Sequence, residues 1–508
     1  MLVLVVLAVA CKPTFAGGSS LDLIVTSPTS ARLVWNTAGD GQYPAAGHSI
    51  GTYEVRVDGS LVATLPATTV SCTLLDLPPS AVTVEVTARS TSGEWSGTLG
   101  SLGIVAASWD PGAGAAATDD GGLGPPGQRG RGQVVSAGGA VTCVPETDTD
   151  GDRLPDWVET DTGIFVDKTD TGTDPADPDT DGDGIDDGDE VTGSVAGLPL
   201  PQLGADPLHK NIFVEVDWFD DAITCGAHSH RPSAAAVARF TDAFAAAPVS
   251  NPDGSTGVDV IVDYGQGGFL NGGTVVSDTT APIGSINGGV TGTEYAAIKA
   301  ANFSAPRRGY FHYAVHLHAY NTSSTSSGQA ELPGDDLVVS LQCFESTNNT
   351  ANTMMHELGH NLNLRHGGFE NTNWKPNYNS VMNYRFQFPG VDHDPGEGGT
   401  TCDALGDAEL DYSAGTRVAL DESAVTEALG VCGATPIDWN LNSVIDAVPY
   451  ARDLNVDGGG TGDGVIATLD DHDDWTSLLF AAVGAGAGAP VAPPEIISDQ
   501  PVPESFRD

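Results

Sequence analysis

The chain has 508 residues, which corresponds to roughly three domains at about 150 residues each. Its 20 Lys and Arg against 68 Asp and Glu give a formal net charge of −48, which disfavours proteins that neutralise nucleic-acid phosphates or bind anionic lipid. Because 40% of the residues are hydrophobic and 17% are charged, the chain can bury a core and is not a disordered polyelectrolyte. No stretch approaches the ~20 apolar residues that a membrane span requires.

The N-terminus carries an apolar run, Met1–Ala10, that is too short to span a membrane and lies where a secretory signal has its hydrophobic core. The residues up to Cys11 resemble a bacterial lipobox, in which the cysteine becomes the lipidated first residue. Cleavage after Ala16 is an alternative, and a buried N-terminal strand is another. We expect residues 1–17 to be a signal peptide or lipoprotein signal. The protein is then extracellular, at the cell surface or in the periplasm, with membrane contact only through a lipid anchor at Cys11.

The other six cysteines are an even number, which fits an exported protein with disulfide bonds. None has the C-x-x-C spacing of a cysteine zinc or redox site. Six thiols allow 15 pairings, and among them we favour the local pair Cys402–Cys432.

Residues 18–106 contain short runs of alternating apolar residues separated by turn signals, such as Asp58-Gly59, and this pattern predicts a β-sandwich. The segment resembles a fibronectin type III module, with Trp35 at the place of the buried second-strand tryptophan. Residues 107–142 are rich in Gly, Ala and Pro, which predicts a linker.

Two aspartate-rich loops lie within residues 143–195. The spacing D-x-[DN]-x-[DN]-G-x5-E supplies the six to eight oxygens that Ca²⁺ prefers. One loop matches this pattern fully, with ligands Asp179, Asp181, Asp183, Asp187 and Glu190. The other has Arg153 in place of the glycine, with ligands Asp148, Asp150, Asp152, Asp156 and Glu159.

The segment 146–191 looks like thrombospondin type 3 calcium repeats, which implies a spacer stiffened by two or more structural Ca²⁺ ions. A solvated acidic hinge is the alternative, but so many carboxylates repel one another unless cations neutralise them. Two later clusters beginning at Asp438 and Asp453 share part of the spacing, and polar turns explain them about as well as calcium does.

A histidine motif follows in the second half of the chain. His356 and His360 are four residues apart, so both imidazoles lie on one helical face and can reach one tetrahedral ion. Glu357 lies beside them and can take a proton from a zinc-bound water. His366 can reach the same ion only if the helix stops before it, and Asn363 is a residue type that tolerates the positive φ of such a stop.

This motif resembles H-E-x-x-H-x-x-G-x-x-H of the metzincin zinc peptidases, with Asn363 at the glycine. Ser380–Tyr384 looks like their Met-turn. The resemblance implies one catalytic Zn²⁺ on His356, His360 and His366, an apolar floor at Met382, and a hydroxyl at Tyr384 that approaches the zinc or stabilises the oxyanion. The Met-turn is similar to that of astacin-like and serralysin-like enzymes and the calcium loops to those of pappalysin-like enzymes, so the subfamily stays open.

The segments around this motif predict an α+β domain over residues 206–485, with a mixed twisted sheet and the active-site helix. Their order resembles the upper half of a metzincin domain over about 206–390. We expect Asp438-Trp439 and Asp474-Trp475 to be packing anchors, and residues 486–508 to be a flexible tail. The expected elements are strands at 211–218, 258–262, 310–320 and 336–341, a helix at 234–247, and the active helix from about 349.

Further histidines lie outside the motif. His312, His316 and His318 share one face of a predicted strand, which raises the hypothesis of a second metal. We favour a polar strand face instead, because no carboxylate accompanies them, and we interpret His209, His228 and His230 in the same way.

The sequence therefore predicts an exported zinc endopeptidase that cleaves protein or peptide substrates, with Glu357 as general base. The rival is a calcium-dependent surface adhesion or scaffold protein that carries an inactive zinc site. We find no cysteine-switch motif, so the silencing of a pro-form stays open.

Overall fold

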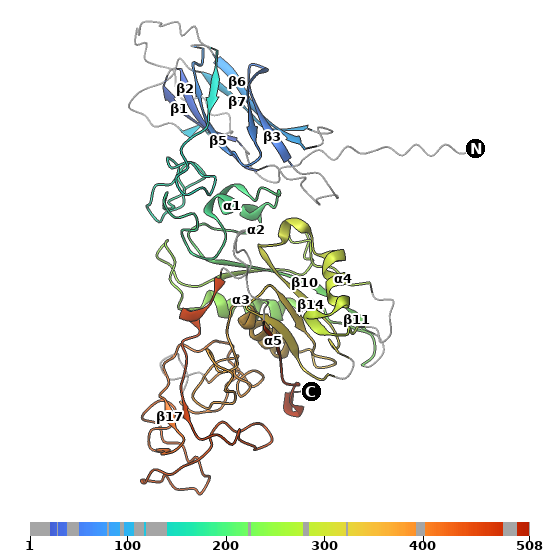
Figure 1. Ribbon diagram of the computed structural model, residues 1–508, viewed down its shortest axis with the longest axis vertical. Coiled ribbons are helices and arrows are strands. Elements are labelled where there is room, and N and C mark those ends of the chain that lie inside the picture. The colour runs from blue at the N-terminus through green and yellow to red at the C-terminus, as the bar shows by residue number, and fades with distance from the viewer. Residues whose placement is uncertain are drawn as a thin grey trace, which may run out of the picture. The chain divides into compact units, whose positions relative to one another are not determined.

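The chain folds into two compact units (Figure 1). One holds residues 1–209 with 252–254 and 304–307, and the other holds the rest. Several sheets and a few helices make the protein a multidomain α+β protein, as expected. Residues 1–17, Cys11 among them, and most of the linker 107–142 lie outside the described residues. The computed structural model describes residues 21–27, 29–37, 50–78, 81–91, 96–105, 116–117, 140–221, 225–277, 284–321, 324–392, 402–480 and 495–506.

Two antiparallel sheets share one hydrophobic cluster in the first unit. Alternate residues of β3, such as Tyr53 and Val55, are buried, and the Trp35 ring meets Tyr53 edge-on with 5.7 Å between centroids. Asp58 and Gly59 both have positive φ, 49° and 74°, which forms the predicted hairpin turn. The sheet orders are β8-β1-β2-β5-β9 and β4-β3-β6-β7. Their strands are β1 (Leu21–Ser27), β2 (Ser30–Trp35), β3 (Ile50–Val57), β4 (Ser60–Pro66), β5 (Ser71–Leu75), β6 (Ala81–Ser90), β7 (Ser96–Val105), β8 (Ala116–Ala117) and β9 (Thr142–Val144).

The Asp-rich segment belongs to the same unit and packs on its first sheet. Thr37 donates its backbone N–H to the Thr192 carbonyl at 2.8 Å, and the Lys168 ammonium lies 2.9 Å from the Asp22 carboxylate. The segment is mostly turns, with the short helices α1 (Asp187–Thr192) and α2 (Leu200–Leu203). A small apolar cluster joins sheet and segment: Val34, Leu154, Val158 and Val191.

A six-stranded mixed sheet forms the second unit, in the order β13-β10-β14-β16-β15-β19. Strands β13, β10, β14 and β16 run parallel to one another, whereas β15 is antiparallel to both of its neighbours, β16 and β19. The 211–218 strand has the predicted bounds, while the 310–320 strand ends earlier, at residue 316. The strands are β10 (Asn211–Trp218), β13 (Asp259–Asp263), β14 (Phe311–His316), β15 (Gly328–Leu332), β16 (Asp336–Val339) and β19 (Glu495–Ser498).

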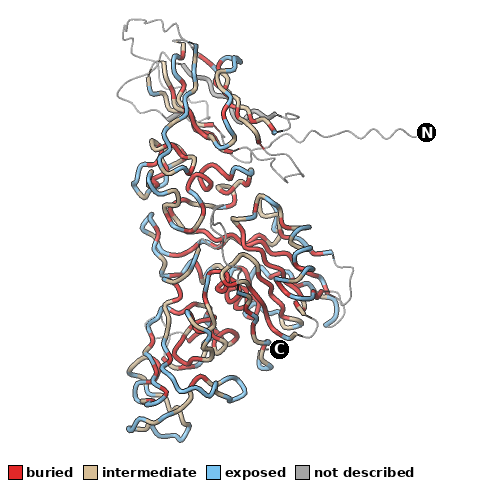
Figure 2. The backbone as a smooth tube through the Cα atoms, in the orientation of Figure 1, coloured by how far each residue is buried: buried red, intermediate tan, exposed pale blue. Residues whose placement is uncertain are grey.

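Helices cover both faces of this sheet. On one face, α3 (Ala234–Ala245) and α5 (Thr347–Asn361) bury apolar residues in the cluster that contains Val214 and Val216 of β10. On the other face, α4 (Thr293–Asn302) places Tyr295 against Tyr313, whose carbonyl accepts the Tyr295 hydroxyl at 2.8 Å. Ser233 caps α3 by accepting the N–H of residue 236, which matches the predicted helix start. Figure 2 shows that the buried backbone concentrates in the strands and in α5.

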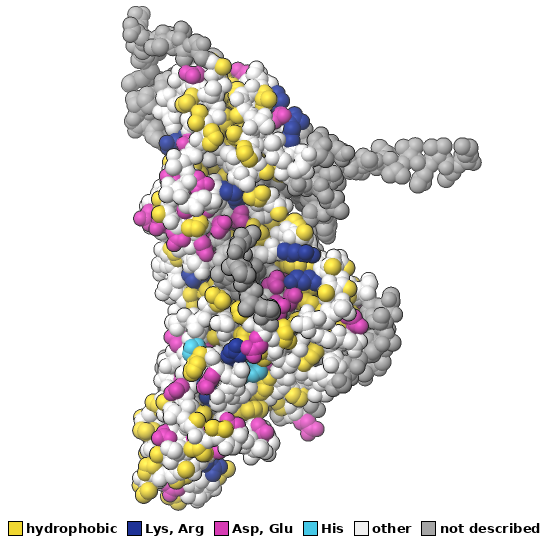
Figure 3. Space-filling view, in the orientation of Figure 1, with side chains coloured by type: hydrophobic (Ala, Val, Ile, Leu, Met, Phe, Trp, Pro, Cys, Tyr) yellow, Lys and Arg dark blue, Asp and Glu magenta, His cyan; other side chains and the backbone are white. Residues whose placement is uncertain are grey.

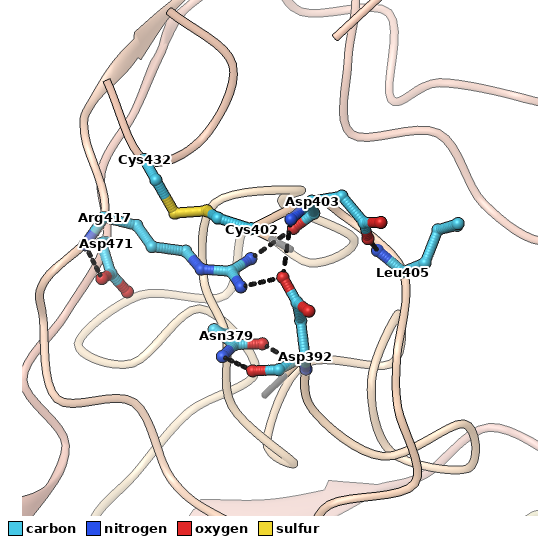
Figure 4. The surroundings of a disulfide bond; sticks show 8 residues. All are labelled: Asn379, Asp392, Cys402, Asp403, Leu405, Arg417, Cys432 and Asp471. Atoms are coloured by element: carbon cyan, nitrogen blue, oxygen red, sulfur yellow. Dashed lines mark hydrogen bonds and ion pairs between the residues drawn. A yellow bond between two sulfur atoms is a disulfide. The ribbon is translucent and has the colours of Figure 1, made fainter. Parts of the chain in front are cut away.

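The described residues between α5 and β19 form a region of turns, whose regular structure is the short strand pair β17 (Leu420–Asp421) and β18 (Thr468–Leu469) with a 3-10 turn at Trp475–Ser477. The predicted disulfide Cys402–Cys432 is present, and beside it the buried Arg417 guanidinium bonds the Asp392 carboxylate at 2.6 Å (Figure 4). Trp475 is buried against Phe244 and Tyr412, as expected of a packing anchor.

Two more disulfides, Cys72–Cys143 and Cys225–Cys343, use the remaining described cysteines. Three disulfides indicate an oxidising environment. Among the described residues, none of the helices has both the length and the apolar content needed to cross a bilayer.

The C-terminal residues differ from the expectation of a flexible tail over 486–508. Residues 495–498 form β19, the outer strand of the sheet, and Asn349 of α5 donates to the Phe506 carbonyl at 2.8 Å. The short apolar pair Ile496-Ile497 gave too weak a periodicity to predict this strand.

Candidate metal centre

Helix α5 carries the first two histidines into the core. Ser346 caps its N-terminus by accepting the Asn349 N–H at 3.0 Å, so the helix begins two residues before the predicted start. His356 and His360 are fully buried one turn apart, with 4.8 Å between ring centroids. A Cβ at Gly359 would lie 2.3 Å from the Met382 sulfur, so the helix approaches the predicted Met-turn closely because residue 359 has no side chain.

The helix stops where the sequence predicted a stop. Asn363 has φ of 78°, and the backbone N–H of Leu364 bonds the Gly359 carbonyl at 2.8 Å, which closes a left-handed C-terminal turn. The chain then reverses and brings His366 to 4.9 Å from His360 and 5.3 Å from His356, measured between ring centroids. The three imidazoles therefore converge.

Hydrogen bonds fix the orientation of two of these rings. His356 Nδ1 bonds the Val381 carbonyl at 2.8 Å and His360 Nδ1 bonds the Leu364 carbonyl at 2.7 Å, so both Nδ1 atoms donate and both Nε2 atoms keep their lone pairs. The two Nε2 atoms lie 3.1 Å apart, close to the separation of about 3.3 Å between two ligands of one tetrahedral Zn²⁺. Burial lowers the pKa of His360 to about 4, which keeps the ring neutral, as a metal ligand must be.

A fourth potential ligand, Asp499, was not predicted. Its Oδ1 lies 2.7 Å from His356 Nε2, 3.4 Å from His366 Nε2 and 3.9 Å from His360 Nε2. Burial alone would raise the pKa of Asp499, but the His356 imidazole and its neighbours hold it well below its ordinary value. The four ligand atoms all lie within 4.8 Å of one another, and such a set of lone pairs fits a cation at its centre.

Glu357 lies next to these ligands, and neither of its carboxylate oxygens has a hydrogen-bond partner among the described residues. Burial, and then the charge of Asp499, raises the pKa of Glu357 well above its ordinary value. Gly328 of β15 leaves the space for this side chain, because a Cβ there would lie 1.9 Å from Glu357 Oε1. A buried carboxylate with a raised pKa is suited to take up a proton.

The two Met-turn residues differ in what they contact. Met382 is fully buried, and its sulfur lies against Gly359 of α5. The Tyr384 ring lies 4.3 Å from the His366 ring between centroids, and its hydroxyl donates to the Ser498 carbonyl at 3.0 Å.

The aspartate loops of the first unit form a second set of buried acids. The structure interleaves the two predicted loops, because Asp152 and Glu159 of one share a group of potential ligands with Asp187 of the other. Both position-nine carboxylates, Asp156 and Asp187, accept a backbone N–H and a hydroxyl from a threonine. Acidic side chains gather over this segment on the face seen in Figure 3.

Burial makes ionisation of several of these acids costly. It raises the pKa of Asp152 to about 7, of Asp187 to about 8 and of Glu159 to about 9. Glu190 is buried, neither of its carboxylate oxygens has a hydrogen-bond partner among the described residues, and its pKa is raised well above its ordinary value. Buried carboxylates whose ionisation is this costly are the kind of ligand that a bound cation would stabilise. Asp148, Asp150 and Asp152 form a further group, while the described contacts of Asp179, Asp181 and Asp183 include hydrogen bonds to their own loop.

One prediction about the other histidines is wrong in its premise. We expected no carboxylate near them, but Asp221 lies with His228, His230 and His318 in a second group of potential ligands. Asp221 belongs to a chain segment 97 residues before His318, so sequence proximity could not reveal the pairing.

No protein-family model matches the chain, and no curated protein matches it. Among solved structures, the chain is similar to the spore cortex lytic enzyme SleM of Clostridium perfringens over 17% of this chain and 26% of that one, with 14% identity and a TM-score of 0.14. The match spans a minor part of either chain, and at that TM-score it carries no argument about function.

Proposed function

We propose that this protein is an exported zinc-dependent endopeptidase of metzincin type. The observation that carries the proposal is the convergence of three buried imidazoles, His356, His360 and His366, beside the unpartnered carboxylate of Glu357. Three histidines with an adjacent glutamate are the donor set of a catalytic zinc site that keeps one position open.

The chemistry divides among these residues. His356, His360 and His366 would hold the zinc ion, which would supply Lewis-acid polarisation of a carbonyl and lower the pKa of a water. Glu357, which lies next to His356 in the sequence, accepts the proton of the attacking water and delivers it to the leaving amine. Tyr384, whose hydroxyl already donates to one peptide carbonyl, donates to the oxygen on which negative charge develops.

The edge of the sheet favours a peptide as the substrate. Strand β15 runs past Glu357 and pairs on its outer side with the extended segment Glu495–Ser498. A substrate in extended conformation can make the same backbone hydrogen bonds, which is how many proteins bind peptides by strand addition.

The other parts of the chain fit a calcium-stiffened exoprotein. The two sheets that share a core support a fibronectin type III-like β-sandwich, and the interleaved acid groups support thrombospondin type 3-like sites for Ca²⁺. Neither part contributes a residue to the histidine site among the described contacts.

Replacement of Glu357 by Gln tests the assignment. We expect E357Q to keep its zinc, measured by mass spectrometry of the metal, and to lose about 10²–10⁴-fold in kcat/KM on a peptide library. The exposed Glu409→Gln is the matched control and keeps full activity. Both variants are also made with Asp499→Asn, because Asp499 contacts the same histidines. Equal cleavage by D499N and by the double variant E357Q/D499N, or no cleavage by any zinc-loaded protein including D499N, would overturn the proposal.

A further inference from the structure

The first inference concerns the group formed by Asp221, His228, His230 and His318, which we name the hairpin cluster. Two segments meet there: one follows strand β10 and carries Asp221, His228 and His230, and the other follows the neighbouring parallel strand β14 and carries His318. The carboxyl ends of parallel strands lie at one edge of a sheet, so side chains distant in sequence come together. The pair β11 (Asp220–Asp221) and β12 (His228–Ser229) places Asp221 opposite His228.

Hydrogen bonds outside the hairpin cluster turn two rings toward its centre. His230 Nδ1 bonds the Glu345 carboxylate and His228 Nδ1 bonds the Gly226 carbonyl at 2.9 Å. The Nε2 atoms of both rings are buried without a hydrogen-bond partner among the described residues, and His230 is only 3% exposed. A histidine that donates Nδ1–H to a carboxylate or carbonyl and leaves Nε2 bare has the arrangement of a metal ligand.

We propose that the hairpin cluster binds a second Zn²⁺ ion. Each of the four residues places a ligand atom within 4.8 Å of the others, and His318 Nδ1 lies 3.1 Å from Asp221 Oδ2. Three imidazoles and one carboxylate give the four-coordinate nitrogen and oxygen set that zinc accepts, and four protein ligands leave no open position. The ion is structural: it ties the ends of β10 and β14 together beside the Cys225–Cys343 disulfide.

Metal analysis of the full-length protein tests this site independently of activity. We expect two Zn²⁺ per chain in the wild type and one in H230Q, while the control His209→Gln keeps two. A wild type with a single Zn²⁺, or an H230Q variant that loses none, would overturn the second site. If H230Q does not fold, anomalous scattering from wild-type crystals at the zinc edge decides: a peak next to His230 Nε2 supports the site, and its absence refutes it.

A second, independent observation concerns the C-terminal segment 495–506 and rests on the proposed function. Strand β19 pairs antiparallel with β15, with Gln329 opposite Ser498, and Asp499 follows directly with its N–H on the Gly328 carbonyl at 3.1 Å. The Asp499 carboxylate thus reaches all three zinc histidines, and Gln387 donates to its other oxygen at 2.6 Å.

We infer that this segment closes the active site from within the same chain. The segment occupies the edge of β15 where an extended peptide would pair. The Ser498 carbonyl accepts the Tyr384 hydroxyl, so this hydroxyl is not available to a substrate. Asp499 lies among the three histidines, in the place that a catalytic water would need. Gln500 holds the segment further by donating to the Tyr384 carbonyl at 2.9 Å. The protein is therefore latent until the segment leaves, and Asp499 supplies the silencing group that no cysteine provides.

Replacement of Asp499 by Asn in the full chain tests the closure. We expect D499N to raise kcat/KM at least about tenfold and to bind a peptide hydroxamate at least about tenfold more tightly, measured by calorimetry, while the exposed Glu504→Gln changes neither. Tighter hydroxamate binding without any cleavage would support the closure and overturn the peptidase assignment. Equal cleavage and equal hydroxamate affinity in D499N and wild type would overturn the closure and leave the peptidase standing.

A measurement on the unaltered protein covers the case in which D499N does not fold. Saturating hydroxamate should displace the segment, so the backbone amides of residues 495–500 should lose protection from hydrogen exchange. Unchanged protection in the hydroxamate complex would refute the closure.

Discussion

The aspartate loops and the histidine site both gather buried metal-ligating side chains, but the two regions hold them differently. The histidines stand on α5 and on a turn closed by backbone hydrogen bonds, and their ring orientations are fixed by carbonyls. Most of the loop carboxylates stand on turns, and Glu190 of the short helix α1 has no hydrogen bond to either carboxylate oxygen from the part of the chain that the structure describes. Regular structure can hold metal-ligating side chains in place before an ion binds, whereas loops depend on the ion for their own folding.

Removal of calcium should show this difference most strongly. A chelator selective for Ca²⁺ should destabilise the first unit by about 4 kcal/mol if the ion was present at 1,000 times its Kd, and should leave the unfolding of the second unit unchanged. Differential scanning calorimetry with added Ca²⁺ or chelator measures both transitions. Equal losses of stability in the two units would contradict the view that only the loops depend on the ion.

The pH dependence of the metal-free loops gives a second signature. Because the folded pKa values of Asp152, Asp187 and Glu159 are raised to about 7, 8 and 9, the metal-free fold is favoured below their unfolded pKa values and loses that stability as pH rises through these values. The chelated protein should therefore melt lower at about pH 9 than at about pH 6, and the calcium-loaded protein should not. A pH-independent melting temperature after chelation would contradict the raised pKa values.

Substitution of Gly328 tests how rigidly the histidine site is prebuilt. In G328A the new Cβ would overlap Glu357 Oε1, so we expect a loss of about 10²-fold in kcat/KM and of about 1–3 kcal/mol in the free energy of unfolding. The control Gly458→Ala, whose Cβ would meet nothing closer than Trp374 at 3.7 Å, should change neither. Wild-type activity in G328A would show that Glu357 moves freely.

The smallest expected effect concerns the turn that places His366. Because Asn363 has φ of 78°, N363G should keep wild-type stability and zinc content, while N363V should lose about 1–2 kcal/mol and bind zinc more weakly. Urea unfolding and metal analysis measure both. Equal stability of the two variants would show that the turn does not constrain the site.

The features that depend on residues close together in the sequence could be predicted from the sequence. Helical spacing placed His356 and His360 on one face, and the tolerance of asparagine for positive φ predicted the turn before His366. The strand 211–218 followed from a continuous apolar pattern that a buried parallel strand requires.

Contacts between distant segments could not be predicted in this way. Asp499 meets His356 across 143 residues, and strand β15 was missed because polar Gln329 and Glu331 interrupt its apolar pattern. The carboxylate of the hairpin cluster was missed for the same reason, since Asp221 and His318 are joined only by the sheet.

The pairing of β19 with β15 also determines which strand lies at the edge of the sheet. An exposed outer strand presents a row of unsatisfied backbone groups on which a second copy of the chain can assemble, and this is a common route to insoluble aggregates. In this chain β19 covers β15, so this side of the sheet ends on a strand of four residues that carries the exposed Glu495, and both features disfavour pairing with a second copy.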